Sequence, residues 1–229
     1  MKDHGDNKEF LKSKRKFVAS YSSGKDSTLA LYKAIRQGME PQALIMTYNA
    51  ERDCSWFHGV PEPILRRIEE SLGIPLRLIR TGGGDKYEAD FEEMLRRERE
   101  KGAEVCVFGD IDLEEHLAWC TRRCRSTGLE ACFPLWQMSR RAAVEEFLDS
   151  GFKTIFTVID TERMDASWLG KTLTREAVEL LEREGVDVCG ENGEYHTFVT
   201  DGPLFRKPVS FTPGRPVRRG KHVILPIQP

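Results

Sequence analysis

The 229-residue chain has no long apolar run, no excess of one charge and no secretory leader pattern. No apolar stretch reaches the about 20 residues that a membrane-spanning helix requires, so we expect no contact with a membrane. The net charge of −2 at pH 7 gives no overall attraction to nucleic acid and argues against a nucleic-acid partner. Residues 1–16 are polar and charged, and we expect them to form a flexible N-terminal arm. These absences favour a cytoplasmic protein.

Cysteine is present, but in no arrangement that is typical of a disulfide framework or a zinc site. No Cys-x-x-Cys pair occurs, and Cys120 and Cys124 supply only two of the four ligands of a tetrahedral site. We therefore expect reduced thiols at all six positions, which are Cys54, Cys106, Cys120, Cys124, Cys132 and Cys189.

Apolar periodicity alternates between strand and helix along the first 130 residues. Strands are expected at 17–22, 43–48, 76–80 and 105–109. Helices are expected at 27–37, 61–72, 86–101 and 112–127, each followed by a glycine suited to end it, namely Gly38, Gly73, Gly102 and Gly128. Repeated strand–helix units predict an α/β fold in which a parallel sheet carries helices on both faces.

The pattern changes in the second half of the chain. After residues 131–136 we expect a helix at 139–150, a strand at 152–159, a helix at 174–184, and strand-like runs at 196–200, 208–212 and 222–227. Short runs separated by Pro and Gly suggest antiparallel strands in a smaller C-terminal α/β lobe. The boundary between the two parts is expected near residue 130.

The segment between the first strand and the first helix is Ser22-Ser23-Gly24-Lys25-Asp26-Ser27. A strand-to-helix turn of small residues points backbone N–H groups and the positive helix end at one spot, which suits a phosphate or pyrophosphate. The segment does not match a Walker loop, because Ala19 stands where that motif has Gly and Asp26 stands where it has Ser or Thr. It does not match the Gly-x-Gly-x-x-Gly pattern of dinucleotide-binding proteins either, because Gly24 is its only glycine. The segment resembles the PP-loop, Ser-Gly-Gly-x-Asp-Ser, of N-type ATP pyrophosphatases, with Ser23 in place of the first glycine.

The side chains of this segment suit the same ligand. The hydroxyls of Ser22, Ser23 and Ser27 could donate to phosphate oxygens, and Asp26 could hold Mg²⁺ or cap the helix. The alternative is an ordinary serine-rich turn in which Asp26 serves only as a helix cap.

Two further segments are expected beside this turn. Ligands of parallel sheets bind at the carboxyl ends of the strands. Gly24–Ser27, Tyr48-Asn49 and Gly109-Asp110 all fall at such ends. The sequence therefore predicts that these positions converge on one rim.

A second polar cluster lies in Gly190-Glu191-Asn192-Gly193-Glu194-Tyr195-His196. Two carboxylates three residues apart could share a magnesium ion or bind an amine or ammonia, and an imidazole offers proton transfer near neutral pH. The alternative is a surface hairpin turn, for which Gly-Glu-Asn-Gly is suitable. Cys189 and Phe198 flank the cluster and favour a place near buried structure.

Taken in order, the motifs resemble the diphthine–ammonia ligase family of the PP-loop ATPases, also called the adenine nucleotide alpha hydrolase superfamily. The resemblance runs from about residue 17 to 208 and rests on Ser22–Ser27, Gly109–Ile111, Phe133–Trp136, Asp165–Gly170, Cys189–Val199 and Asp201–Phe205. It implies a Rossmann-like PP-loop ATP-binding domain at 17–130 and an acceptor-substrate domain at 131–229. It also implies an ATP-dependent ligase that adenylates a carboxylate, releases pyrophosphate and transfers ammonia to the carboxylate.

The resemblance implies roles for individual residues, with ATP and Mg²⁺ as cofactors. The residues expected to bind the phosphates of ATP are Ser22, Ser23, Gly24, Lys25, Asp26 and Ser27. The backbone near Met46 and Tyr48 is expected to bind adenine. Gly109 and Asp110 are expected to complete the rim of the nucleotide site. Metal binding is expected at Asp26 and Asp110, and catalysis at Asp26, Glu191, Glu194 and His196. The acceptor or ammonia is expected at Glu191, Asn192 and Glu194, with Trp136 and Trp168 as pocket walls or plain core.

The acceptor depends on the source organism. Diphthine on elongation factor 2 is expected for an archaeal or eukaryotic protein, and another carboxylate otherwise. Two alternatives stay open, a PP-loop enzyme that modifies RNA and a non-catalytic module that binds ATP or AMP. A homodimer is compatible with all three.

Overall fold

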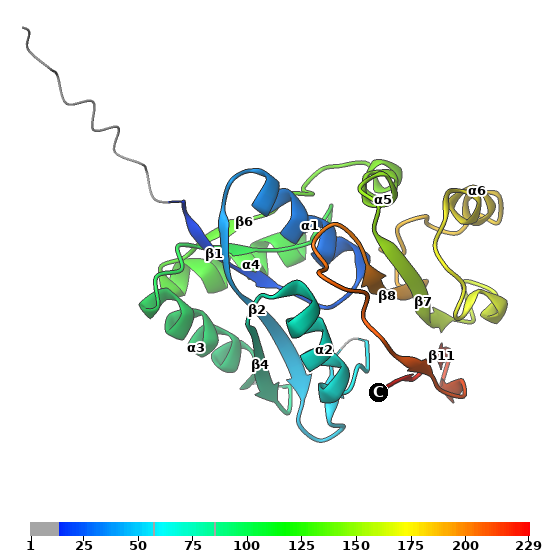
Figure 1. Ribbon diagram of the computed structural model, residues 1–229, viewed down its shortest axis with the longest axis horizontal. Helices are drawn as coiled ribbons and strands as arrows, with labels where there is room; N and C mark the ends of the chain where they lie inside the picture. The colour runs from blue at the N-terminus through cyan, green and yellow to red at the C-terminus, as the bar shows by residue number, and fades with distance from the viewer. Residues whose placement is uncertain (1–13, 57, 85) are drawn as a thin grey trace, which may run out of the picture.

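The computed structural model describes residues 14–56, 58–84 and 86–229, which form two larger sheets with helices packed against them and one two-stranded sheet of β9 and β12 (Figure 1). The first part of the chain contains β1 (Lys16–Ser20), α1 (Lys25–Arg36), β2 (Glu40–Asn49), β3 (Cys54–Ser55), α2 (Glu62–Leu72), β4 (Leu76–Thr81), α3 (Lys86–Glu100), β5 (Val105–Val107), α4 (Glu114–Thr127) and β6 (Glu130–Cys132). The second part contains α5 (Arg140–Asp149), β7 (Lys153–Asp160), the 3-10 helix η1 (Ala166–Trp168), α6 (Arg175–Arg183), β8 (Tyr195–Asp201), β9 (Thr212–Pro213), β10 (Val217–Arg219), β11 (His222–Ile224) and β12 (Ile227–Gln228).

The first sheet has five parallel strands in the order β4, β2, β1, β5 and β6. Its central strand β1 is apolar on both faces because both are covered. Phe17 and Ala19 pack in the cluster that includes α1 and α2, whereas Val18 packs in the cluster that includes α3 and α4. The expected parallel sheet with helices on both faces is confirmed.

Strand β3 was not predicted, and its position matters for the site. β1 pairs with β2 only as far as Ile45, and β4 occupies the opposite edge of β2. The antiparallel pairs Tyr48–Ser55 and Asn49–Cys54 therefore lie on the edge that β1 has left. The chain after β3 consequently folds over the turn that follows β1.

The second sheet is antiparallel, with the order β10, β11, β7 and β8, and it confirms the smaller lobe. Figure 1 shows this lobe beside the parallel sheet, with α5 and α6 at the same end of the molecule. The strand expected at 208–212 is wrong, since only Thr212–Pro213 pairs there, and β10 was missed. The 190–196 segment is not a hairpin turn, because it joins α6 to β8.

The two lobes are bonded to each other at the turn after β1. Val199 in β8 donates its backbone N–H to the carbonyl of Ser23 at 2.9 Å. The backbone N–H of Lys25 donates to the Thr197 hydroxyl at 3.1 Å. These two bonds place β8 directly alongside the turn.

The expected N-terminal arm falls mostly on residues 1–13, outside the described residues. Arg15 is described, and its guanidinium bonds Glu130 at 2.7 Å. The six cysteines all lie in the described part of the chain and are free thiols, as expected. Among the described helices, none has the length and apolar character needed to cross a membrane.

Candidate active site

The turn from β1 to α1, residues Ser22–Ser27, which we call the PP-loop, is held by its own hydroxyls. The Ser22 and Ser27 hydroxyl oxygens lie 3.0 Å apart, and Ser22 Oγ accepts the backbone N–H of Gly24 at 3.2 Å. Helix α1 begins without a side-chain cap, so Asp26 does not serve as one. Uncapped N–H groups and the positive helix end favour an anion at this point.

Ser23 has a different position from the other loop serines. Its backbone φ of 69° lies in the left-handed region, where the PP-loop pattern has a glycine. The side chain is fully buried, and its hydroxyl donates to the Ser22 carbonyl. Ser23 therefore shapes the loop, and its hydroxyl does not line the cavity.

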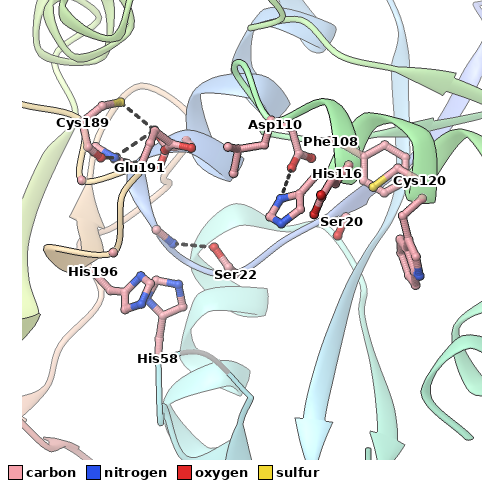
Figure 2. A pocket seen from close by; sticks show the side chains of 18 of the residues that line it. Ser20, Ser22, His58, Phe108, Asp110, His116, Cys120, Cys189, Glu191 and His196 are labelled. Atoms are coloured by element: carbon pink, nitrogen blue, oxygen red, sulfur yellow. Dashed lines mark hydrogen bonds and ion pairs between the residues drawn. The ribbon is translucent and has the colours of Figure 1, made fainter. Parts of the chain in front are cut away.

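Two adjoining cavities open beside the PP-loop, one of about 930 Å³ and one of about 210 Å³. The smaller one reaches Met46, Thr47 and Gly109 at the ends of β2 and β5. The larger one extends between α3 and α4 to Phe91 and Trp119. Both are lined by Ser20, Ser22, Asp26, His58, Tyr87, Asp110 and Glu191. The predicted rim of strand ends is thus the place where the cavities meet (Figure 2).

Gly109 brings the end of β5 against the start of α1. A Cβ added there would lie 2.8 Å from the carbonyl carbon of Asp26 and 2.8 Å from the backbone N of Ser27. Both are backbone atoms, so no side chain can be accommodated without moving the PP-loop. Gly109 therefore allows the backbone after β5 to lie directly against the PP-loop backbone.

Lys25 is buried in the wall of the larger cavity, and its ammonium is bonded to protein groups. Its ammonium bonds both carboxylate oxygens of Asp26, at 2.8 and 3.0 Å, and donates to the Cys189 carbonyl. Burial is the largest single effect and lowers the pKa of Lys25, but Asp26 and the neighbouring acidic groups together outweigh it, so the pKa is raised. The lysine therefore stays charged and forms an ion pair with Asp26.

Asp26 and Glu191 bring two carboxylates together in the cavity wall. Oxygen atoms of both, with the Cys189 sulfur, lie within 4.8 Å of one another. Burial and the nearby charge of Asp26 raise the pKa of Glu191 to about 7. The two carboxylates suit Mg²⁺, a hard cation that prefers oxygen. The thiol does not, because burial raises the pKa of Cys189 and keeps it protonated.

Asp110 lies across the same cavities. Its carboxylate is 3.0 Å from His116 Nδ1 in α4, and this contact raises the pKa of His116 (Figure 2). The oxygen ligands expected for a metal, Asp26 and Asp110, therefore border one space, together with Glu191.

A network of hydrogen bonds, partly exposed to solvent, shapes the segment before β8. Asp187 accepts the backbone N–H groups of Cys189 and Glu191, at 3.1 and 2.9 Å. Arg140 bonds Asp187 at 2.6 Å and Asn192 at 3.0 Å. Glu194 is buried and accepts both the backbone and the side-chain N–H of Asn192 at 3.1 Å. Asn192 and Glu194 do not line the cavities, and their acceptor-binding role stays a prediction without a cavity to support it.

The expected aromatic walls and one nucleotide residue also lie elsewhere. Trp168 is buried against Phe156 and donates to Glu184 at 3.1 Å, while Trp136 packs on Phe133. Neither tryptophan lines either cavity. The Tyr48 hydroxyl donates to Asp53 at 2.8 Å, and Thr47 takes the place beside Met46 in the small cavity.

Sequence reasoning missed several lining residues, above all His58, Tyr87, His116 and Trp119. His58 follows a two-residue strand that leaves no periodic pattern. The other three lie on α3 and α4, where only the three-dimensional path of the helices shows which side faces the cavity. For His58, the only indication in the sequence was that a histidine occurs in the segment that follows β2.

Comparison with known proteins agrees with this architecture. Residues 15–131 match the diphthamide synthase N-terminal domain, and residues 139–224 match the diphthamide synthase C-terminal domain. A mouse protein named diphthine–ammonia ligase is 28% identical, with 92% of this chain and 88% of the mouse protein covered. A human protein of the same name is 29% identical, with 84% and 81% covered.

More distant proteins extend the comparison. A Schizosaccharomyces pombe protein named diphthine–ammonia ligase is 25% identical over 86% of this chain and 36% of its own length. A solved structure described as a predicted subunit of tRNA methyltransferase from Methanocaldococcus jannaschii is 14% identical, with a TM-score of 0.43 and coverage of 85% and 100%. Because the two matched domains together take in both sheets and the PP-loop, the chain belongs to the diphthamide synthase family.

Proposed function

We propose that the protein is an ATP-dependent ligase that adenylates a carboxylate, with release of pyrophosphate, and transfers ammonia to it. The observation that carries the proposal is the PP-loop at the junction of two cavities. A nucleotide needs a phosphate-binding turn and a neighbouring pocket for its base, and the proposal is supported by a turn that suits an anion beside a small cavity. The acceptor needs separate room, which the larger cavity offers at about 930 Å³.

In this proposal the adenine lies in the small cavity, against the backbone of Met46 and Thr47. The polyphosphate lies at the PP-loop, where Ser22, Ser27 and the start of α1 supply hydrogen-bond donors. Fixed donors stabilise the charge that develops on departing pyrophosphate, and holding the carboxylate beside ATP removes most of the entropic barrier. Mg²⁺, which Asp26 and Asp110 would hold, would neutralise part of that charge when bound.

Glu191 has the chemistry for the ammonia step. With a pKa of about 7, its carboxylate can take a proton from ammonium or from the attacking amine at neutral pH. Its position between Asp26 and the larger cavity suits a cationic ligand. The name of the relatives makes diphthine the first acceptor to test.

The open alternatives make different predictions. An RNA-sulfurating enzyme requires a reactive thiolate, and the raised pKa of Cys189 opposes one in this cavity. A non-catalytic module would bind ATP without breaking it. Product analysis separates all three.

The deciding experiment supplies ATP, Mg²⁺, ammonium and elongation factor 2 that carries diphthine, and measures AMP, ADP and pyrophosphate. We expect AMP and pyrophosphate in equal amounts, with an amide on the acceptor. Asp26→Asn should reduce AMP formation by about 100-fold or more because it removes a carboxylate that would hold Mg²⁺ and that pairs with Lys25. Asp53→Asn, which alters a carboxylate outside the cavities, should leave AMP formation within about twofold. ADP as the product, or ATP that binds and stays intact, would refute the proposal.

A further inference from the structure

Two imidazole rings from different lobes meet beside the PP-loop. His58 follows β3, and His196 lies in β8; their ring centroids are 5.0 Å apart with an angle of 61° between the planes. Figure 2 shows the two rings next to each other, close to Ser22. Both residues line the larger cavity together with Ser22 and Lys25.

The chain fixes both rings in place. The backbone N–H of Ser55 donates to the Val60 carbonyl at 2.8 Å, and the Val60 N–H donates to the Ser55 hydroxyl at 3.0 Å, which closes the segment that carries His58. The ring lies so close to the loop that a Cβ on Gly24 would be 3.1 Å from His58 Cε1. His196 is fixed through β8, which is bonded to the loop at its next residue, Thr197.

Both rings are neutral at pH 7. Burial lowers the pKa of His58 to about 3 and that of His196 to about 4, and Lys25 adds to both shifts. Each ring also faces other titratable groups: His58 faces His196, while His196 faces His222, which lowers its pKa, and Asp26, which raises it. The buried Nδ1 of His58 has no hydrogen-bond partner among the residues that the structure describes. Such an atom costs free energy unless a ligand or a rearranged ring satisfies it.

The lysine of the PP-loop does not neutralise the negative charge of a bound phosphate. The donors of Lys25 go to Asp26 and to the Cys189 carbonyl, so the lysine is not free to bind a phosphate. A polyphosphate beside these two neutral imidazoles favours their protonation, because a nearby negative charge stabilises the charged form. A protonated imidazole donates strong, charge-assisted hydrogen bonds.

We propose that His58 and His196 form a second phosphate-binding element beside the PP-loop, which donates hydrogen bonds to the polyphosphate of ATP and gains a proton as it binds. The two histidines bind the pyrophosphate part of ATP and do not contribute to the binding of AMP. The inference rests on the proposed function, because it requires ATP at the PP-loop. It adds two ligand-binding residues, one of which comes from each lobe.

The test measures the binding of three probes by calorimetry at pH 7: AMP, inorganic pyrophosphate, and the ATP analogue with a methylene group between the α and β phosphates. The variants are His58→Gln, His196→Gln and the double variant. Each single change should weaken binding of pyrophosphate and of the analogue by about tenfold, since one charge-assisted bond is lost. Binding of AMP should stay within twofold, which also shows that the variants are folded. His222→Gln is the matched control, because His222 lies near His196 but does not line the cavity, and it should match the wild type.

Proton uptake gives a second readout. Repeating the analogue titration in buffers of different ionisation enthalpy counts the protons taken up, and the wild type should take up more than the double variant. Equal affinity and equal uptake in the two proteins would overturn the inference, as would an equal loss for AMP and pyrophosphate. If the wild type binds neither AMP nor the analogue, the proposed function fails and the inference falls with it. Normal nucleotide binding with unaffected histidine variants overturns only the inference.

Discussion

At the scale of single residues, the PP-loop depends on small groups that permit close approach. Ser22 and Ser27 hold the turn through their hydroxyls, and Gly109 lets β5 touch its backbone. These residues were predicted as nucleotide ligands, and the geometry adds that two of them also build the loop. The chemistry and the shape of the site thus depend on the same side chains.

Gly109→Ala tests this close approach. The added Cβ would lie 2.8 Å from two backbone atoms, so the PP-loop must shift. We expect the free energy of unfolding to fall by about 1–3 kcal/mol, a typical cost of overpacking, and nucleotide binding to weaken at least tenfold. Gly82→Ala is the control: its Cβ would meet no atom of the described residues within 4 Å, so the change should alter neither quantity. Urea denaturation and analogue binding measure both effects. Unchanged nucleotide binding in Gly109→Ala would contradict the assignment of the loop.

Residue identity alone could not decide which polar groups face the cavity. Glu191 and Glu194 are equivalent in the sequence, yet Glu191 lines the cavity and Glu194 is buried under Asn192. Trp168 was expected as a pocket wall or as plain core, and it is buried away from both cavities. Whether such a side chain faces the cavity or the core depends on the path of the backbone in segments without periodic structure. Apolar patterns in the sequence do not reveal that path.

At the scale of elements, the parallel sheet was predictable because its strands and helices carry complete periodic patterns. The predicted helices differ from α1 to α6 by at most two residues at each end. Strand β3 could not be predicted, because two residues make no pattern and its pairing depends on where β1 ends. His58 was missed for the same reason.

Arg140, at the start of α5, links elements that surround the site. It bonds Asp112 after β5 at 2.8 Å as well as Asp187 before β8. Asp187 in turn holds the backbone of Glu191. The guanidinium thereby fixes the segment that carries the proposed base.

Arg140→Gln should therefore impair chemistry more than nucleotide binding. We expect amide formation to fall about tenfold or more, because a displaced group loses its alignment with the reacting atoms, while analogue affinity changes little. Stability should fall by about 1–3 kcal/mol, since Asp187 is left buried without its charge partner. Arg141→Gln removes only exposed ion pairs to Glu145 and Glu182 and should cost about 0.5 kcal/mol or less. Equal effects of the two changes would show that the Arg140 network does not position the segment.

At the scale of the whole molecule, two sheets meet along the PP-loop, and the buried His58 and the half-buried His196 lie at their junction. This arrangement makes the stability of the fold sensitive to acid. His58 has an ordinary pKa of 6.5 and a pKa of about 3 in the folded protein. Between these values the unfolded chain takes up a proton that the folded chain excludes, so lowering the pH favours unfolding.

The free energy of unfolding should consequently fall as the pH is lowered from 7 to 5, with His58 contributing up to about 1.4 kcal/mol per pH unit below its ordinary pKa. His58→Gln should make this slope shallower. His116→Gln should make it steeper, because Asp110 raises the pKa of His116 and that pair stabilises the fold at low pH. Urea denaturation at pH 5, 6 and 7 measures the three slopes. Identical slopes in the wild type and His58→Gln would contradict the buried, neutral state of His58.

The bonds from Val199 to Ser23 and from Lys25 to Thr197 have a consequence for how the protein can be divided. A fragment that ends after β6 would keep every loop residue and still lack two of the contacts that give the loop its conformation. Grafting the hexapeptide into another parallel-sheet scaffold would fail for the same reason. We therefore expect the proposed nucleotide site to require both lobes, because the turn is hydrogen-bonded to the far half of the chain.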